Sequence, residues 1–305
     1  MDSILSKSDE RRLKKLRLKA TRRDQYKRYT RSGASNFFYT FFLIVFGAFS
    51  VLPMIYSIIT SFKPLDELLV FPPRFYVINP TTENYVLLPS IMDNLTVPFS
   101  RYAFNSLFIS VVTTFLHVLV GSAAAYVLSK TKLKGKAIIF TIIQMSLLYN
   151  AYTLAIPRYL IFSYMGLIDT YWVYILPAIP SSMGVFLMKQ FMDSNIPDAL
   201  IEAAQIDGAG PFRIYWSIAM PNVKPAWLTL TLFSFRDMWS LQPAGTIFTE
   251  ELKTLPVAAA TVAAGGLSRQ GAAMAIAVLL MIPPIIVYLV SQRSVTQTMS
   301  SSGIK

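Results

Sequence analysis

Apolar runs alternate with polar connections along the whole chain, and this alternation predicts its architecture. The runs lie at about 37–62, 102–128, 137–152, 171–192, 225–248 and 271–291. A helix that crosses a bilayer needs ~20 mostly apolar residues, so each run is a candidate span. We therefore expect an all-α integral membrane protein with six transmembrane helices. Prolines inside the runs predict kinked or broken helices at Pro53, Pro177, Pro180, Pro283 and Pro284.

The charges of the connections orient these spans. Residues 1–35 carry twelve Lys/Arg against four Asp/Glu, four lysines lie within 130–136, and residues 63–100 carry two Lys/Arg against four Asp/Glu. Because cytoplasmic loops are enriched in Lys and Arg, the first two segments are expected inside and the third outside. Both termini are then cytoplasmic. The basic tail is interpreted either as a helix on the anionic inner leaflet or as a solvated segment that fixes the topology.

This pattern divides the chain into four parts. We expect a basic cytoplasmic tail at 1–35, a first transmembrane helix with an outer connection at 36–100, a core transmembrane domain at 101–291 and a cytoplasmic tail at 292–305. Six prolines within 63–100 argue against a buried helix there.

Composition and charge exclude several classes of protein. Of the 305 residues, 54% are hydrophobic and 14% are charged, against about 25% charged in soluble proteins. The net charge of +12 would suit nucleic acid, but the basic residues cluster beside apolar runs, so no nucleic-acid partner is expected. The absence of cysteine, the single histidine and the lack of a G-x-x-x-x-G-K-[ST] phosphate loop predict no catalytic, metal or cofactor site.

Residues 195–225 are too polar to span a bilayer and too patterned for a plain linker. Pro197 suits a first helical position, and Glu202 lies near the positive end of that helix dipole. The stretch 208–211 is expected to break this helix, and Pro221 to end a second one. The apolar residues of the second helix are expected on one face: Phe212, Tyr215, Trp216 and Ala219.

The spacing of the fixed positions in this stretch supplies a resemblance. Glu202-Ala203-Ala204 is followed after three residues by Gly208 and after nine more by Ile218-Ala219-Met220-Pro221. This arrangement resembles the EAA loop of importer-type ABC transporter permeases, with Met220 where a Leu is usual. An alternative is an amphipathic helix lying on the bilayer, with Tyr215 and Trp216 as interfacial anchors. That alternative would not require Asp207, Gly208 and Pro221 together.

The resemblance covers about 38–305 and implies the importer-type ABC permease fold, with its coupling loop at 195–221. It also implies partners: a second homologous permease, two cytoplasmic ABC ATPase subunits that hold ATP and Mg, and an extracellular or periplasmic solute-binding protein. The location implied is the cytoplasmic membrane of a bacterium, crossed several times. The residues implied in ATPase coupling are Glu202, Ala203, Ala204, Asp207, Gly208, Phe212, Tyr215, Trp216, Ile218 and Pro221.

Further phrases resemble the carbohydrate-uptake, maltose-type branch of that family. They are FNSL at 104–107, the outer segment from SFKP to FPPRFYVINPTTENYVLL, MGLIDTY, TLP and the tail ending in SSSGIK. A sugar, and specifically an oligosaccharide, is the expected cargo. The chain departs from the family pattern at SLLYNAYT, which lacks a usual proline, and at RDMWSLQP, where a WND-like phrase is common.

Candidates for the substrate path are polar and aromatic residues at membrane depth, because sugars bind through hydrogen bonds and flat aromatic surfaces. Helix–helix hydrogen bonding and a position at the outer boundary are the competing interpretations. Arg236 and Asp237 are neighbours on a helix, so each is expected to need its own partner. His117 is either a packed core histidine or a path residue. The candidates are Asn105, Gln144, Tyr149, Asn150, Arg236, Asp237, Trp239 and Gln242.

Two other functions stay open on sequence alone. The same apparatus could carry another small solute, such as an amino acid or a peptide. A carrier or membrane enzyme that works without an ATPase is the other alternative. Secondary carriers often contain internal repeats with interrupted helices, and the sequence shows no convincing repeat.

Overall fold

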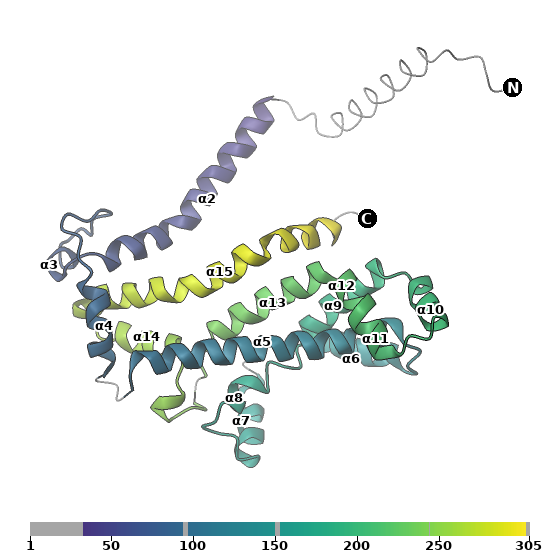
Figure 1. The fold of residues 1–305 in the computed structure, drawn as a ribbon. Coiled ribbons are helices and arrows are strands. Elements are labelled where there is room, and N and C mark those ends of the chain that lie inside the picture. The colour runs from purple at the N-terminus through teal and green to yellow at the C-terminus, as the bar shows by residue number, and fades with distance from the viewer. Residues whose placement is uncertain (1–32, 94–96, 150–152, 244, 303–305) are drawn as a thin grey trace, which may run out of the picture. The chain divides into compact units, whose positions relative to one another are not determined.

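The computed structural model describes residues 33–93, 97–149, 153–243 and 245–302, where all regular secondary structure is helical (Figure 1). The basic tail predicted at 1–35 lies almost wholly outside these residues. The chain divides into two compact units, 1–56 and 57–305, and each is described by itself.

The first unit consists of helix α2 (Gly33–Ser61), which continues for a few residues into the second unit. This helix contains Pro53, and every side chain from Ser35 to Ile55 is exposed. Its exposed surface includes many large apolar side chains, such as Phe37, Phe41 and Phe49. A helix that is apolar all round needs an apolar environment, in agreement with the first predicted span.

The second unit begins with an outer connection whose prediction needs a correction. Residues 63–100 contain the short helices α3 (Leu65–Leu68) and α4 (Glu83–Asp93), and α4 includes Pro89. Leu88 on α4 is buried among apolar residues of later helices, so part of this stretch is a packed helix. The Nδ2 of Asn84 donates to the carbonyls of Ser61 and Lys63 at 2.9 and 2.8 Å. The Asn84 amide thus provides a hydrogen-bond donor for two carbonyl oxygens at and just beyond the end of α2, where the last carbonyls of a helix lack partners in the helix itself.

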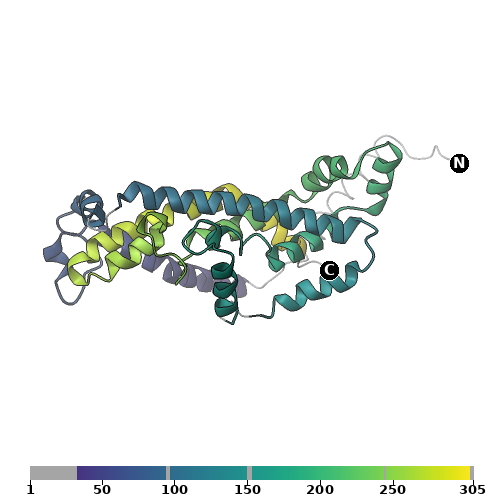
Figure 2. The ribbon, with the colours of Figure 1, turned by 90° about the horizontal axis from the view of Figure 1, so that it is seen from below.

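Helix α5 (Phe99–Lys130) is the central element of the second unit. It packs against α9 (Ser182–Asn195) and α13 (Lys224–Trp239), and its buried face is made largely of small and polar residues. Small side chains let helix backbones approach closely. Figures 1 and 2 both place α10 at one end of α5, and α4 and α14 (Leu255–Ala263) at the other. The polar members of the face are Asn105, Ser106, Ser110, Thr113, Thr114, His117 and Ser122.

The third and fourth apolar runs form shorter helices than the spans predicted. The run at 137–152 forms α6 (Lys136–Ser146), and α7 (Ala155–Tyr164) follows. The run at 171–192 is divided into α8 (Trp172–Ile175) and α9, with Pro177 and Pro180 in the gap between them. The predicted break is therefore confirmed. Backbone groups in such a gap must find partners elsewhere when they lie at membrane depth.

His117 of α5 supplies one of these partners. Its Nδ1 donates to the carbonyl of Ala178 at 2.7 Å, inside the gap between α8 and α9. Its Nε2 is buried without a hydrogen-bond partner. The histidine is thus a packed residue that contacts a broken helix through one nitrogen only.

The last two runs differ from prediction at their ends. Helix α13 ends at Trp239, so the prediction that this span reaches residue 248 is wrong. Helix α15 (Gln270–Ser302) continues through Pro283 and Pro284 and beyond residue 291. Three helices in the described residues are long and apolar enough to cross a membrane, and they are those containing Ser35–Ser61, Phe99–Lys130 and Leu267–Gln292.

Gly184 should be a sensitive position, because it brings α9 close to α5. A Cβ on Gly184 would lie 2.6 Å from His117 Nε2 and 3.2 Å from a methyl carbon of Leu230. Gly184→Ala is expected to cost about 1–3 kcal/mol of stability by overpacking. A lower midpoint of thermal unfolding in detergent would show this loss.

Gly47→Ala is the matched control, since no atom lies within 4 Å of a Cβ there. The destabilisation by Gly184→Ala should shrink in a His117→Ala background. An equal loss in both backgrounds would refute the close contact.

Candidate functional site

The stretch singled out in the sequence begins with helix α10 (Asp198–Ile206). Pro197 precedes the helix in extended conformation rather than occupying its first turn. The helix ends in a Schellman turn, in which the N–H of Ala209 bonds to Ala204 O at 2.9 Å and that of Gly208 to Gln205 O at 3.1 Å. Gly208 has φ +78°, a conformation that residues with a Cβ rarely adopt. The shape of the turn therefore requires a glycine at position 208.

The second half of the stretch continues further than the sequence predicts. Helix α11 (Pro211–Ile214) leads into a π-helical turn, η1 (Tyr215–Ala219), and then into α12 (Met220–Asn222). Pro221 does not end the helix. A proline lacks an N–H and crowds the preceding turn, and the wider π-helical turn just before Pro221 accommodates it. Helical structure thus continues almost without interruption from Pro211 to Trp239.

One face of this element is packed into the core. Ile201 and Ala204 of α10, and Ile214, Tyr215 and Ala219 of the second half, are buried in one cluster. The same cluster contains residues near the C-terminal end of α5, four buried residues of α9 and residues near the start of α13. Displacing the element would therefore require these three helices to move as well.

Polar contacts attach the element specifically to α5. The hydroxyl of Tyr215 shares a hydrogen bond of 2.7 Å with Ser122 Oγ, and its ring lies 5.5 Å from that of Tyr126. Lys130 Nζ contacts Asp198 Oδ1 at 2.8 Å at the start of α10. The Lys130 ammonium lowers the pKa of the Asp198 carboxyl. Asp198 also lies at the helix N-terminus, where a negative charge is favourable.

The opposite face of the element is exposed, and its membership differs from the prediction. Glu202 and Ala203 are exposed, and Ile206 and Phe212 beside the Gly208 turn are 87% and 78% exposed. Tyr215 and Ala219 are buried whereas Phe212 and Trp216 are exposed, so the predicted common face is divided between the core and the surface. The buried side is centred on Ile214 and Tyr215, which leaves the other two aromatic rings at its edges.

Two further expectations for this element change in the same way. Ala204 is buried and Ile218 half-buried, so neither offers a free surface. Ile206 was missed by the sequence reasoning. Its spacing of four from Glu202 places both on one helical face and could have revealed it.

The substrate-path candidates are not brought together. Asn105 is fully buried: its Nδ2 donates to Glu251 O and Lys253 O at 2.8 Å each, and its Oδ1 accepts from Tyr171. Trp239 is also buried, and its Nε1 donates to Leu280 O at 2.9 Å. Both side chains are therefore engaged in holding other segments in place.

The remaining candidates are exposed or lie outside the described residues. Arg236 and Asp237 form an ion pair with each other at 3.0 Å, against the expectation that each needs its own partner. Both side chains are exposed, so they have room to turn toward each other although they leave the helix in different directions. Gln144, Tyr149 and Gln242 are exposed, and Asn150 lies outside the described residues. Among described residues, no hydrogen bond joins Gln144 or Tyr149 to the candidates of the fifth run.

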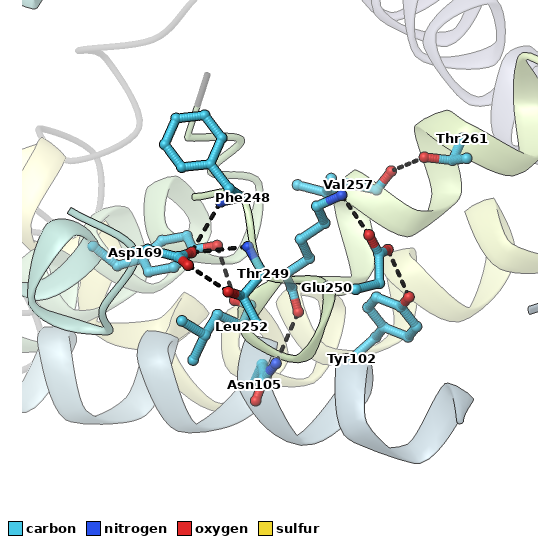
Figure 3. A network of polar contacts seen from close by, with 11 residues as sticks. Tyr102, Asn105, Asp169, Phe248, Thr249, Glu250, Leu252, Val257 and Thr261 are labelled. Atoms are coloured by element: carbon cyan, nitrogen blue, oxygen red, sulfur yellow. Dashed lines mark hydrogen bonds and ion pairs between the residues drawn. The ribbon is translucent and has the colours of Figure 1, made fainter. Parts of the chain in front are cut away.

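A polar clamp holds the connection between α13 and α14 (Figure 3). Asp169 accepts from the N–H groups of Phe248 and Thr249 at 2.9 Å each and from the Thr249 hydroxyl. Glu250 accepts from Tyr102 at 2.7 Å and pairs with Lys253 at 2.5 Å. Together with Asn105, these contacts fix residues 248–253 against α5 and the turn before α8.

Comparison with known proteins identifies this arrangement. Residues 117–301 match the family described as the binding-protein-dependent transport system inner membrane component. The chain belongs to this family. As a permease of that kind it is a transport subunit, and ATP hydrolysis belongs to a separate partner subunit. The family match, a relative named as an inner membrane ABC transporter permease and the apolar helices of this chain agree with a bacterial inner-membrane protein.

Two relatives of this permease are similar over most of its length. The chain is 27% identical over 267 residues to the inner membrane ABC transporter permease protein YcjP of Escherichia coli K12, covering 86% of this chain and 94% of that one. It is 26% identical over 276 residues to the arabinooligosaccharides transport system permease protein AraQ of Bacillus subtilis, covering 87% and 94%.

A solved structure agrees with the fold. A chain of a bacterial ABC transporter involved in the import of the acidic polysaccharide alginate superposes on the permease with a TM-score of 0.73 at 25% identity, covering 87% of this chain and 99% of that one. The importer-type ABC permease fold is therefore confirmed at the level of the chain's architecture.

The Asp169 clamp predicts a specific dependence on pH. Hydrogen bonds from the Thr249 hydroxyl and from the backbone N–H groups of Thr249 and Phe248 lower the pKa of Asp169 below its usual 3.8. The ionised form thus stabilises the clamp above pH ~3.8, and this contribution is lost as the pH falls through the lower native pKa. Between pH 5 and 8 the clamp should be unchanged, as hydrogen exchange of residues 246–252 can measure.

Asp169→Asn removes the charge while keeping a residue type that tolerates the φ of +61° found there. The amides of Phe248 and Thr249 should then exchange several-fold faster at pH 7, with no further acid step. Asp66→Asn, an exposed change elsewhere on the outer connection, is the control. Unchanged exchange in Asp169→Asn would show that the clamp does not form.

Proposed function

We propose that this permease is one half of the membrane pathway of an ATP-driven importer that translocates an oligosaccharide by alternating access. It spans the cytoplasmic membrane six times with both termini inside. Its partners are a second homologous permease, two cytoplasmic ATPases and an external solute-binding protein. The three long apolar helices support three of the spans, and the shorter helices α6, α9 and α13 account for the others.

The observation that carries this proposal is the two-sided character of the element formed by α10, α11 and η1. Its inner face is packed among α5, α9 and α13, while Ile206 and Phe212 project from the other face with most of their surface free. Exposed apolar side chains beside a carboxylate are typical of a protein contact surface. Glu202 is the polar contact to the ATPase, and Ile206 and Phe212 fill or border its cleft.

The contacts of the element also define what moves with it. The buried cluster around the element supports a group of moving helices that includes α9 and α13. The Lys130–Asp198 ion pair and the Tyr215–Ser122 hydrogen bond add α5, the second span, to the group. Closure of the ATPase dimer then displaces the inner ends of α5, α9 and α13 as a single packed body.

The class of cargo rests on the relatives and on the resemblance of several sequence phrases. AraQ is named for arabinooligosaccharides, and the superposed importer carries an acidic polysaccharide. The exposed residues Gln144, Tyr149, Arg236 and Gln242 offer hydrogen bonds and an aromatic surface to such a cargo, whereas Asn105 and Trp239 serve the protein's own structure.

The direct test is uptake by the complete transporter in proteoliposomes. Labelled neutral and uronic oligosaccharides should enter only when ATP is inside and the loaded binding protein is outside. Uptake of amino acids or peptides in preference to oligosaccharides would overturn the cargo. Transport by the permeases without any ATPase would overturn the mechanism.

Reversing the charge of Glu202 tests the coupling contact. Glu202→Lys is expected to lower ATP-driven uptake by at least about tenfold, because like charges facing each other across an interface cost several kcal/mol. The amount of ATPase that co-purifies should fall in parallel. Asp66→Lys makes the same reversal on the outer connection and should leave both readouts unchanged. Normal uptake by Glu202→Lys would remove this residue from the docking surface.

A pair of glycine variants tests the shape of the turn. Gly208 and Gly210 both have open space around a Cβ, but only Gly208 has a positive φ, +78° against −70°. Gly208→Asp is expected to abolish uptake while the protein still inserts in the membrane. Gly210→Asp adds the same charge at a position where Asp caps a helix, so it should retain much more activity. Equal losses would point to charge rather than to backbone shape.

A further inference from the structure

An apolar groove lies between α5, α13, α15 and η1, outside the coupling surface described above. Its volume is about 560 Å³, and its walls are almost entirely apolar. Phe115 and Val118 come from α5, Trp227 and Phe235 from α13, and Val287 from α15. A polar side chain in its wall, Thr231, already bonds to Trp227 O at 2.8 Å, so the groove offers few polar groups to a ligand along its length.

One end of the groove has a different chemistry. Lys224, Trp216 and Trp227 lie there, and Lys224 is exposed with no carboxylate paired to it among the described residues. A negative group bound there would pair with the Lys224 ammonium. Trp and Lys together are typical of the boundary between hydrocarbon and headgroups.

The depth of the groove agrees with this boundary. Val111 and Phe115 lie at the middle of α5, which runs from residue 99 to 130, so the Phe235 end of the groove is near the midplane. Eleven residues separate Phe235 from Lys224, or ~16 Å at the helical rise of ~1.5 Å per residue. That length is about one leaflet of a hydrocarbon core ~30 Å thick. The groove therefore runs from midplane to the cytoplasmic headgroups.

We propose that this groove binds a phospholipid of the inner leaflet with an anionic headgroup. An acyl chain lies along Phe115, Trp227 and Phe235, and the phosphate contacts Lys224 and the indole N–H of Trp216 or Trp227. This inference rests on one part of the proposed function, namely that the α10 end of α5 faces the cytoplasm. Because Trp216 belongs to η1, the lipid contacts the same element that couples to the ATPase.

The competing occupant is a helix of the partner permease, which would also cover an apolar groove. The isolated lysine and the one-leaflet length favour the lipid, because a headgroup phosphate would pair with Lys224 at the boundary while its acyl chain covers the apolar walls. A helix of the partner would also continue past the midplane, whereas the groove ends near Phe235.

The test uses the complete transporter in nanodiscs, with a photo-crosslinking amino acid in place of Phe115. One set of nanodiscs contains phosphatidylglycerol and the other only phosphatidylcholine. Mass spectrometry should find a phosphatidylglycerol adduct on this permease, at least about fivefold more abundant than the phosphatidylcholine adduct. Lys224→Glu should reduce that adduct at least about fivefold, and Lys134→Glu, an exposed lysine on the cytoplasmic loop, should leave it unchanged.

Each other outcome overturns the site. A cross-link to the partner permease assigns the groove to a subunit interface, and no adduct leaves it without a ligand. Equal adducts with both lipids, or equal effects of the two lysine variants, refute recognition of the anionic headgroup. The lipid adducts are measured by mass spectrometry, and this measurement does not depend on transport. A transporter that binds the lipid but moves no oligosaccharide would refute the proposed function alone.

Discussion

Every backbone group at membrane depth needs a partner, and this constraint governs the second unit. The chain interrupts its helices repeatedly, and α5 supplies side chains that fill the interruptions. His117 bonds to Ala178 O in the gap between α8 and α9, Asn105 bonds to Glu251 O and Lys253 O, and Ser106 accepts the N–H of Leu255 at 2.7 Å. The polar stripe on α5 is therefore a set of contacts to broken backbone as much as a packing surface.

The apolar pattern missed the packed helix α4 but predicted where the long helices occur, because burial in lipid or protein requires long apolar segments. It could not predict their ends, which depend on tertiary contacts. Helix α13 ends shortly before Pro243 and Gly245, which are helix breakers, and Asp169 bonds to the N–H groups of Phe248 and Thr249 from a distant turn. Pro221 misled the sequence analysis for a related reason, because a π-helical turn absorbs it without ending the helix.

The sequence singled out the element formed by α10, α11 and η1, but its buried and exposed faces were not separated correctly. Spacing places Phe212, Tyr215 and Trp216 near one another, and their rings do lie within 6.5 Å of Tyr215. Spacing cannot say where the core lies around the helix axis. The hydrogen bond from Tyr215 to Ser122 decides that question, and it draws one aromatic residue inward while its neighbours stay outside. Asn105 was mistaken for a ligand-binding residue for the same reason, since a buried amide and an accessible one look alike in sequence.

The clamp at Asp169 has a consequence for how the pathway opens. The N–H of Asp169 also bonds to Thr246 O at 3.0 Å. Two backbone segments from different parts of the chain are therefore held side by side. These hydrogen bonds hold the two segments together, so the segments are expected to move as one. In the proposed importer, an opening at this end would then form where this subunit meets its neighbour.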